Sequence, residues 1–325
     1  MAHNLKLSIY KFSLSEANKS KFLKLQDVFK KIDSKSTTKK EAYNQFVKFY
    51  IESFNGEFKT NSEKTKSIFP EELEIESPRN LISGFFKGGL SDIERDIFEK
   101  KNTKKPKGKI NKEDITSLPY YFMMWTPVDL DQGIIMIQYY SSSSISGAVT
   151  EDLRSFFKDF NLSLRIFPYV PNEYKEKFFK KSTIKKISFL KRSVPKNVRS
   201  KFDPLISEEE NFEIALELRS LNKSPKSFKE TVKALINSGK KLINADLSDL
   251  GMDDEQVKDE MRIYYETSEG KKSYAKLSNN FDILPTIDLP DIIKAKNSDK
   301  PDRDKISKHC RALMNKLKNE LNIDE

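Results

Sequence analysis

The sequence predicts an α+β fold, mainly an antiparallel sheet with packed helices, in two subdomains. Short segments in which apolar and polar residues alternate recur along the chain, and this pattern is typical of strands with one exposed face. Between them lie segments whose apolar residues follow helical spacing. The 325 residues are 37% hydrophobic and 33% charged, which is enough apolar material for a core. No apolar stretch approaches the roughly 20 residues that a membrane-spanning helix needs, so we expect no membrane association.

The first part of the chain is predicted to begin with a strand over residues 5–12, where Leu, Leu and Ile alternate with polar residues. A helical pattern starts at residue 15 and continues to residue 32. We interpret residues 46–60 as a hairpin, because the Asn-Gly pair within them suits the left-handed positions of a tight turn. Residues 61–80, with two prolines, are expected to be a loop, and residues 81–86 a short strand ended by a pair of glycines.

The middle of the chain contains its most hydrophobic segments. Residues 120–128 and 134–140 are predicted to be the central strands of the sheet, and the lysine-rich residues 101–112 before them a mobile loop. A helix is expected to start with Thr150 as N-cap, followed by four apolar residues at helical spacing. Residues 162–168 alternate as a strand.

The last part of the chain is predicted to contain the following elements: a helix over 172–181, strands over 183–193 and 212–221, a helix over 224–236, a hairpin over 261–277 and an amphipathic helix over 306–321. The alternation within 183–193 is poor, because Ile184, Ile187 and Leu190 also fit a helix. We divide the chain into an N-terminal α+β domain, residues 1–207, and a C-terminal α+β domain, residues 208–325.

Charge is concentrated in one segment. The chain has a net charge of +10, and residues 175–201 alone sum to that value, with Glu176 as their only acidic residue. A surface of this kind displaces counterions from phosphates and binds nucleic acid without sequence preference. Aromatic residues lie among the lysines, and exposed rings stack on bases. The residues predicted to contact nucleic acid are Lys180, Lys181, Lys185, Lys186, Lys191, Arg192, Lys196 and Arg199. The alternative is a solvated face that neutralises acidic parts of the fold or of a partner.

The sequence lacks most motifs of catalysis. We find no P-loop, dinucleotide-binding glycine fingerprint, zinc-type cysteine pair, HExxH or GxSxG, so no cofactor and no metal are expected. Four Glu-x-Lys triplets occur, no more than the composition predicts by chance, and only Glu57 and Lys59 lie on a predicted strand. Such a pair on one strand face is the basis of an alternative hypothesis, a metal-dependent nuclease. Cys310, the only cysteine, is expected in the core beside His309.

Residues 134–201 follow an order of elements that resembles a known group of proteins. An apolar strand is followed by a serine-rich turn, an amphipathic helix, a short strand and a basic segment. This order resembles RexA, the exclusion protein of temperate phage, and anti-phage defence proteins such as KwaB of the Kiwa system. The resemblance covers about a fifth of the chain and carries no catalytic motif. It implies a DNA-binding, dimeric protein of prokaryotic or phage type that acts in defence or exclusion.

We therefore expect a cytosolic protein that binds nucleic acid, DNA rather than RNA, and is not an enzyme. The cytosolic location follows from the single cysteine and from the absence of a signal-like N-terminal segment. A homodimer is left open. A third hypothesis is a protein-interaction module whose basic face contacts an acidic protein.

Overall fold

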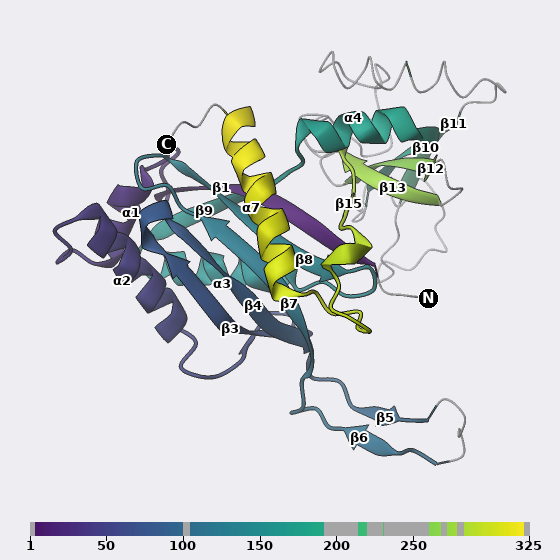
Figure 1. Ribbon diagram of the computed structural model, residues 1–325, viewed down its shortest axis with the longest axis horizontal. Helices are drawn as coiled ribbons and strands as arrows, with labels where there is room; N and C mark the ends of the chain where they lie inside the picture. The colour runs from purple at the N-terminus through teal and green to yellow at the C-terminus, as the bar shows by residue number, and fades with distance from the viewer. Residues whose placement is uncertain are drawn as a thin grey trace, which may run out of the picture. The chain divides into compact units, whose positions relative to one another are not determined.

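The computed structural model describes residues 4–99, 105–191, 214–219, 230, 260–267, 272–277 and 283–321 (Figure 1). The chain forms two compact units. Unit 1 comprises Met1–Tyr169 with Ile287–Glu325, and unit 2 comprises Val170–Thr286. The predicted α+β class with a mainly antiparallel sheet is confirmed. The boundary expected between residues 207 and 208 lies outside the described residues, and the C-terminal helix belongs to unit 1 rather than to a separate C-terminal domain.

Unit 1 is built on an eight-stranded antiparallel sheet in the order β15-β1-β8-β7-β4-β3-β2, with β9 also pairing with β1. Its strands are β1 (Leu5–Glu16), β2 (Lys59–Thr60), β3 (Lys66–Glu76), β4 (Leu81–Leu90), β7 (Thr116–Trp125), β8 (Gln132–Tyr140), β9 (Leu162–Tyr169) and β15 (Ile287–Asp288). The central position of β7 and β8 agrees with the hydrophobic segments that predicted them. Most residues of β8 and the second half of β7 are buried, so their side chains contribute to the core of the unit.

One edge of β1 is occupied by two segments that are far apart in sequence. Tyr169, the last residue of β9, lies opposite Ile9, and Ile287, the first residue of β15, lies opposite Leu7. Both segments run antiparallel to β1, so β15 continues the line of β9 after a gap of one residue position. Unit 2 is therefore inserted into what would otherwise be a single edge strand.

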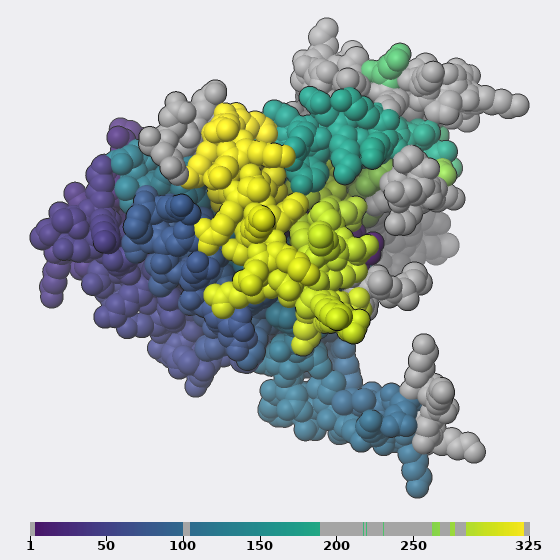
Figure 2. All heavy atoms as spheres, in the orientation of Figure 1, coloured from purple at the N-terminus to yellow at the C-terminus, as the bar shows by residue number. Residues whose placement is uncertain are grey.

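Helices cover both faces of this sheet. On one face lie α1 (Leu25–Ile32), α2 (Lys39–Glu52) and α3 (Ser146–Lys158). Phe46 of α2 stacks on Phe157 of α3 with ring centroids 5.8 Å apart. On the other face lies α7 (Arg303–Glu320), which Figure 2 shows in yellow over the strands. Lys318 of α7 lies 4.6 Å from the ring centroid of Trp125 on β7. Among the described residues, no helix combines the length and apolar character needed to cross a membrane.

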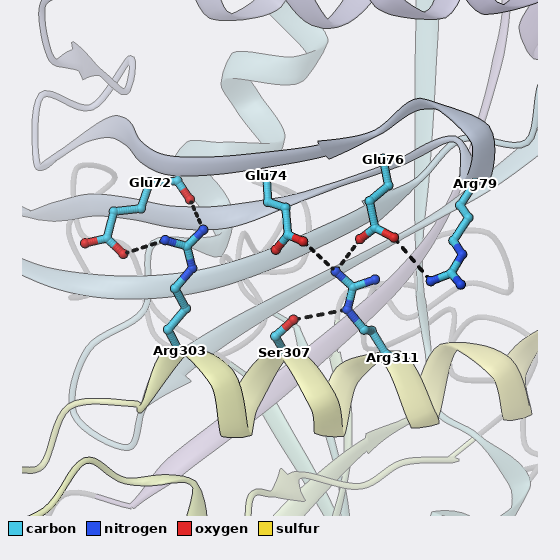
Figure 3. Close-up of polar contacts among 7 residues, drawn as sticks. All are labelled: Glu72, Glu74, Glu76, Arg79, Arg303, Ser307 and Arg311. Atoms are coloured by element: carbon cyan, nitrogen blue, oxygen red, sulfur yellow. Dashed lines mark hydrogen bonds and ion pairs between the residues drawn. The ribbon is translucent and has the colours of Figure 1, made fainter.

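Arginine side chains hold α7 against β3 (Figure 3). Arg303 donates hydrogen bonds to the side chain and the main-chain carbonyl of Glu72. Arg311 pairs with Glu74 at 3.3 Å and with Glu76, and its hydrogen bond to Glu76 lowers the pKa of that carboxyl. Arg79, in the turn that follows β3, also pairs with Glu76, at 3.2 Å. Beneath these pairs Cys310 is fully buried, as expected, and burial raises the pKa of its thiol to about 12.

The hairpin predicted over residues 46–60 is wrong. Residues 39–52 form α2 instead, because Thr38 and Glu41 make a capping box that starts a helix. Asn55 and Gly56 do adopt positive φ angles, of 51° and 74°, but they follow the end of the helix rather than join two strands. The positive φ angles expected at this Asn-Gly pair are confirmed, and the strand expected before the pair is wrong.

Four further features differ from the prediction. Residues 66–76, predicted as loop, form β3, and the helix predicted from residue 15 begins at Leu25 because β1 continues to Glu16. The glycine pair does not end β4. It lies inside the strand, where a Cβ at Gly89 would come within 1.8 Å of the Thr116 carbonyl oxygen of the neighbouring strand. The helix expected from Thr150 begins at Ser146, so Asp152 lies mid-helix.

The segment predicted as a lysine-rich loop is partly strand. β5 (Arg95–Ile97) and β6 (Gly108–Ile110) pair as a two-stranded ribbon that extends from the eight-stranded sheet (Figure 1). Lys107 and Lys109 each pair with a glutamate of this ribbon, Glu99 at 3.1 Å and Glu94 at 2.6 Å. Two of the ribbon's lysines are thus neutralised locally.

Unit 2 is described through one helix and a five-stranded antiparallel sheet in the order β11-β10-β12-β13-β14. Its elements are α4 (Asn172–Lys181), β10 (Ser182–Lys191), β11 (Ile214–Arg219), β12 (Glu260–Thr267), β13 (Lys272–Leu277) and β14 (Ile283–Leu284). The predicted helix over 172–181, the strands over 183–193 and 212–221, and the pairing of the two arms of the 261–277 hairpin are confirmed. The helix predicted over 224–236 lies outside the described residues, apart from residue 230.

Candidate nucleic-acid interface

A β-bulge in β10 sets the direction of two lysines of the basic segment. The register between β10 and β12 shifts between Ile184 and Lys186, so Lys185 is an extra residue without a cross-strand partner. Ile184 and Ile187, on either side of the bulge, are both buried, at 3% and 1% exposure. An inserted residue re-aims the side chains beside it. The bulge therefore explains why these isoleucines are three residues apart in a strand.

The buried side of this sheet faces α4. Phe178 of α4 packs edge-on against Tyr265 of β12, with ring centroids 4.6 Å apart. Ile263 and Ala275, which lie opposite each other on β12 and β13, are buried on the same side. Because successive strand residues point to opposite faces, the residues on either side of these face away from α4. We call that second side the basic face of unit 2.

A row of side chains crosses the basic face from β11 to β13. Arg219 lies opposite Lys186, Lys186 opposite Tyr264, and Tyr264 opposite Tyr274. The Lys186 ammonium lies 4.4 Å from the Tyr264 ring centroid. The two tyrosine centroids are 5.8 Å apart, and the Arg262 guanidinium lies 4.8 Å from the Tyr274 ring. Two cations, on β11 and β10, thus adjoin two rings, on β12 and β13. Lys186 and Arg262 each lie close enough to one of the rings for cation–π attraction.

The described side chains of the basic face have a positive net charge. They carry five cations, against two carboxylates: Lys185, Lys186, Arg219, Arg262 and Lys276, with Glu217 and Glu266. Glu217 accepts hydrogen bonds from Lys186 and Arg219, which lower the pKa of its carboxyl and keep it ionised. Lys185 pairs with Glu266 at 3.0 Å. Even with both glutamates ionised, three positive charges remain in excess.

The structure distributes the predicted contact residues over different places. Lys185 and Lys186 lie on the basic face. Lys180 and Lys181 belong to α4, which covers the opposite side of the sheet, and Lys180 pairs with Glu176 at 3.6 Å. Lys191 ends β10, and its side chain is not described. The remaining predicted contacts lie outside the described residues: Arg192, Lys196 and Arg199.

The aromatic residues of the basic segment do not all serve as stacking platforms. Phe178 and Phe179 are buried, so they belong to the core of unit 2. The rings that are available lie elsewhere in the sequence, at Tyr264 and at Tyr274, which is 40% exposed. Sequence reasoning missed both. The signal is present in the alternation Arg262, Tyr264, Glu266 along one hairpin arm, but it only gains meaning once the strand pairing brings this arm beside Lys186.

The alternative nuclease residues occupy a different environment, in unit 1. Lys59 begins β2 and donates hydrogen bonds of 2.8 Å to Asp152 and to Ser53, while Glu57 is exposed in the preceding turn. The Tyr50 hydroxyl donates to the second Asp152 oxygen at 3.0 Å. Burial raises the pKa of Asp152, and the Lys59 ammonium counteracts that effect.

Lys59 and Asp152 line a cavity of about 400 Å³, together with Asn61, Glu151 and Asp159. The partner of Lys59 is thus the aspartate, and the strand pair with Glu57 does not form. In the part of the chain that the structure describes, no group of three histidine, cysteine or acidic residues is placed to hold a metal ion.

The fold and this surface define an α+β protein with a positively charged, tyrosine-bearing sheet face on its inserted unit. Compared with protein-family models and with curated protein sequences, the chain finds no match.

Proposed function

We propose that the chain binds nucleic acid without sequence preference through the basic face of unit 2. The observation that carries the proposal is the convergence of Lys185, Lys186, Arg219 and Arg262 on one side of a sheet, with a surplus of positive charge. Lysine and arginine side chains that neutralise phosphates release condensed counterions, which supplies affinity independent of base sequence. Lys185, whose side chain is 53% exposed, can exchange the Glu266 carboxylate for a phosphate at little net cost.

The resemblance to RexA and to the Kiwa protein extends this proposal. It adds DNA as the principal nucleic acid and anti-phage defence or exclusion as the setting. This extension depends on the order of elements in residues 134–201 and is independent of the basic face.

Charge reversal on the bulge tests the proposal. The variant Lys185→Glu with Lys186→Glu is expected to weaken binding of a labelled oligonucleotide, measured by fluorescence anisotropy over a series of salt concentrations. The plot of log affinity against log salt should become shallower by about 0.9 per lost phosphate contact on duplex and about 0.7 on single strands. The neutral variant, Lys185→Gln with Lys186→Gln, should show a smaller loss in the same direction.

The matched control places the same change of charge on unit 1. Lys21 and Lys40 are both exposed, so Lys21→Glu with Lys40→Glu alters net charge equally without touching the basic face. Equal weakening by both double variants would mean that only net charge matters, and the site assignment would fail. If the unaltered protein binds no nucleic acid but retains an acidic protein, the protein-interaction alternative takes its place.

A further inference from the structure

The centre of the basic face is aromatic rather than charged. Tyr264 and Tyr274 lie side by side on β12 and β13, with an interplanar angle of 44°. Lys186 and Arg219 flank them towards β11, and Arg262 and Lys276 lie on their own two strands. A surface that bound only phosphates would gain no affinity from aromatic rings beside its cations. The arrangement therefore calls for a ligand with both phosphates and flat, accessible faces.

We propose that the ligand of the basic face is single-stranded nucleic acid, with unpaired bases stacked on Tyr264 and Tyr274. This inference rests on the proposed nucleic-acid binding and names its substrate class. In a duplex the base faces are already covered by neighbouring bases, so the tyrosines gain nothing from them. In a single strand the faces are free, and stacking on an aromatic side chain is sequence-tolerant because every base has a π face.

The surroundings of the two rings support this assignment. Tyr274 is 40% exposed, although a tyrosine in a sheet gains free energy from burial. The Lys186 ammonium and the Arg262 guanidinium lie within 5 Å of the ring centroids, where they can reach phosphates on either side of a stacked base. The separation of the rings, 5.8 Å, is close to the spacing between neighbouring strands, so the rings form a continuous platform. Bases and phosphates of one strand thus find complementary groups on the same face.

Three ligands of equal length separate stacking from charge: a single-stranded oligonucleotide, an abasic oligonucleotide with the same phosphates, and a duplex. Binding is measured by fluorescence anisotropy at two salt concentrations. The unaltered protein is expected to prefer the single strand to both other ligands. Tyr274→Ala should weaken binding of the single strand about 5- to 150-fold and leave the abasic ligand unchanged. Tyr274→Phe keeps the ring and should retain the preference.

Two controls make the result specific. Phe167→Ala removes a ring that is 49% exposed on β9 of unit 1, and it should leave all three affinities unchanged. Tyr274→Trp introduces a fluorophore at the platform, and its emission should be quenched by the single strand and not by the abasic ligand. Circular dichroism spectra of all variants should match that of the unaltered protein.

The outcomes distinguish this inference from the proposal on which it rests. Equal, salt-dependent affinity for all three ligands overturns stacking and leaves electrostatic binding in place. A preference for duplex, or an equal loss in Tyr274→Ala and Tyr274→Phe, also overturns stacking. The absence of binding to any of the three ligands, or binding that Lys185→Glu with Lys186→Glu leaves unchanged, overturns the proposed function itself.

Discussion

Lys59 shows how little sequence spacing says about which charges meet. The Glu-x-Lys spacing placed its partner two residues away, at Glu57. In the fold the partner is Asp152, 93 residues distant, and the two are joined because β2 and α3 border the same cavity. Local periodicity indicates which side of an element a residue occupies, but not which distant element packs there. The nuclease alternative therefore depended on a contact that the fold does not make.

The ion pair between Lys59 and Asp152 is expected to matter for stability. Lys59→Met leaves a buried carboxylate with Tyr50 as its remaining hydrogen-bond donor, and at pH 7 the free energy of unfolding should fall by about 1–3 kcal/mol. The pKa of Asp152 is already raised by burial, and loss of the ammonium raises it further. A carboxyl whose folded pKa is raised destabilises the folded state when it is ionised, and this cost disappears as the carboxyl becomes protonated. The deficit should therefore shrink as the pH falls through the folded pKa towards 3.8, as measured by urea unfolding between pH 4 and pH 8.

The control for this prediction removes the titrating group. In Lys59→Met combined with Asp152→Asn, no carboxyl is left to protonate at this position, so the pH-dependent recovery should disappear. A single variant that stays as stable as the unaltered protein at every pH would contradict a structural role for the pair.

At the scale of elements, α7 depends on a few arginines. The 3.6-residue periodicity of residues 306–321 predicted the helix and its buried stripe, including Cys310. It did not predict the strand that receives it, because residues 61–80 carry two prolines and dispersed glutamates that resemble a loop. The glutamates that made this segment resemble a loop are the residues that bind the arginines of α7 (Figure 3).

Cys310 reports on the docking of α7. It is the only cysteine, it is fully buried, and a thiol-reactive probe can reach it only when the helix opens locally. Arg311→Ala removes the pairs with Glu74 and Glu76 and should raise the labelling rate about 10-fold or more, since hydrogen bonds between charged groups contribute about 1.5–3 kcal/mol each. The rate is measured in native buffer with the probe in excess.

Arg79→Ala is the matched control for α7. Arg79 also pairs with Glu76, but it is 68% exposed and lies in the turn that follows β3, so its loss should change the labelling rate little. Equal acceleration in both variants would mean that the charge of Glu76, rather than the tie between helix and strand, governs the opening.

β10 shows why the basic segment was only partly understood from sequence. The isoleucines at 184 and 187 break strict alternation, which favoured a helix as much as a strand. One inserted residue, Lys185, reconciles the two patterns, and it also turns two consecutive lysines towards the face that carries the tyrosines. A period-2 pattern in the sequence does not reveal where a bulge interrupts the strand. It also does not reveal which strand about 75 residues away pairs with it.

In the whole molecule, unit 2 is inserted into the sequence of unit 1, and no pattern in the sequence predicted this insertion. Composition and length suggested two consecutive domains, because a sequence pattern does not show that residues 162–169 and 287–288 pair with the same strand. Such long-range pairing is set by the packing of the sheet as a whole. The fold class was predictable from periodicity, and the division of the chain was not.

Removal of the insert tests this organisation. A chain in which a linker of one to three residues replaces residues 170–286 should still form unit 1, because Tyr169 and Ile287 lie opposite Ile9 and Leu7 on β1, about 7 Å apart at the rise of a strand. The near-ultraviolet circular dichroism of Trp125, buried beneath α7, should persist, with cooperative thermal unfolding.

The matched truncation ends the chain at residue 169 and omits both β15 and α7. It should lose that dichroism signal and bind a hydrophobic dye, since the face of the sheet that α7 covers becomes exposed to water. If the shortened chain with the linker behaves like the truncation, unit 2 is required for the folding of unit 1.

An edge strand that is interrupted and then resumed leaves two chain ends within a few ångströms of each other. Any compact module whose own termini are close together can be joined there by genetic fusion while the surrounding sheet keeps its pairing. The position therefore offers a place to exchange unit 2 for another module, with the remainder of the protein serving as a constant carrier.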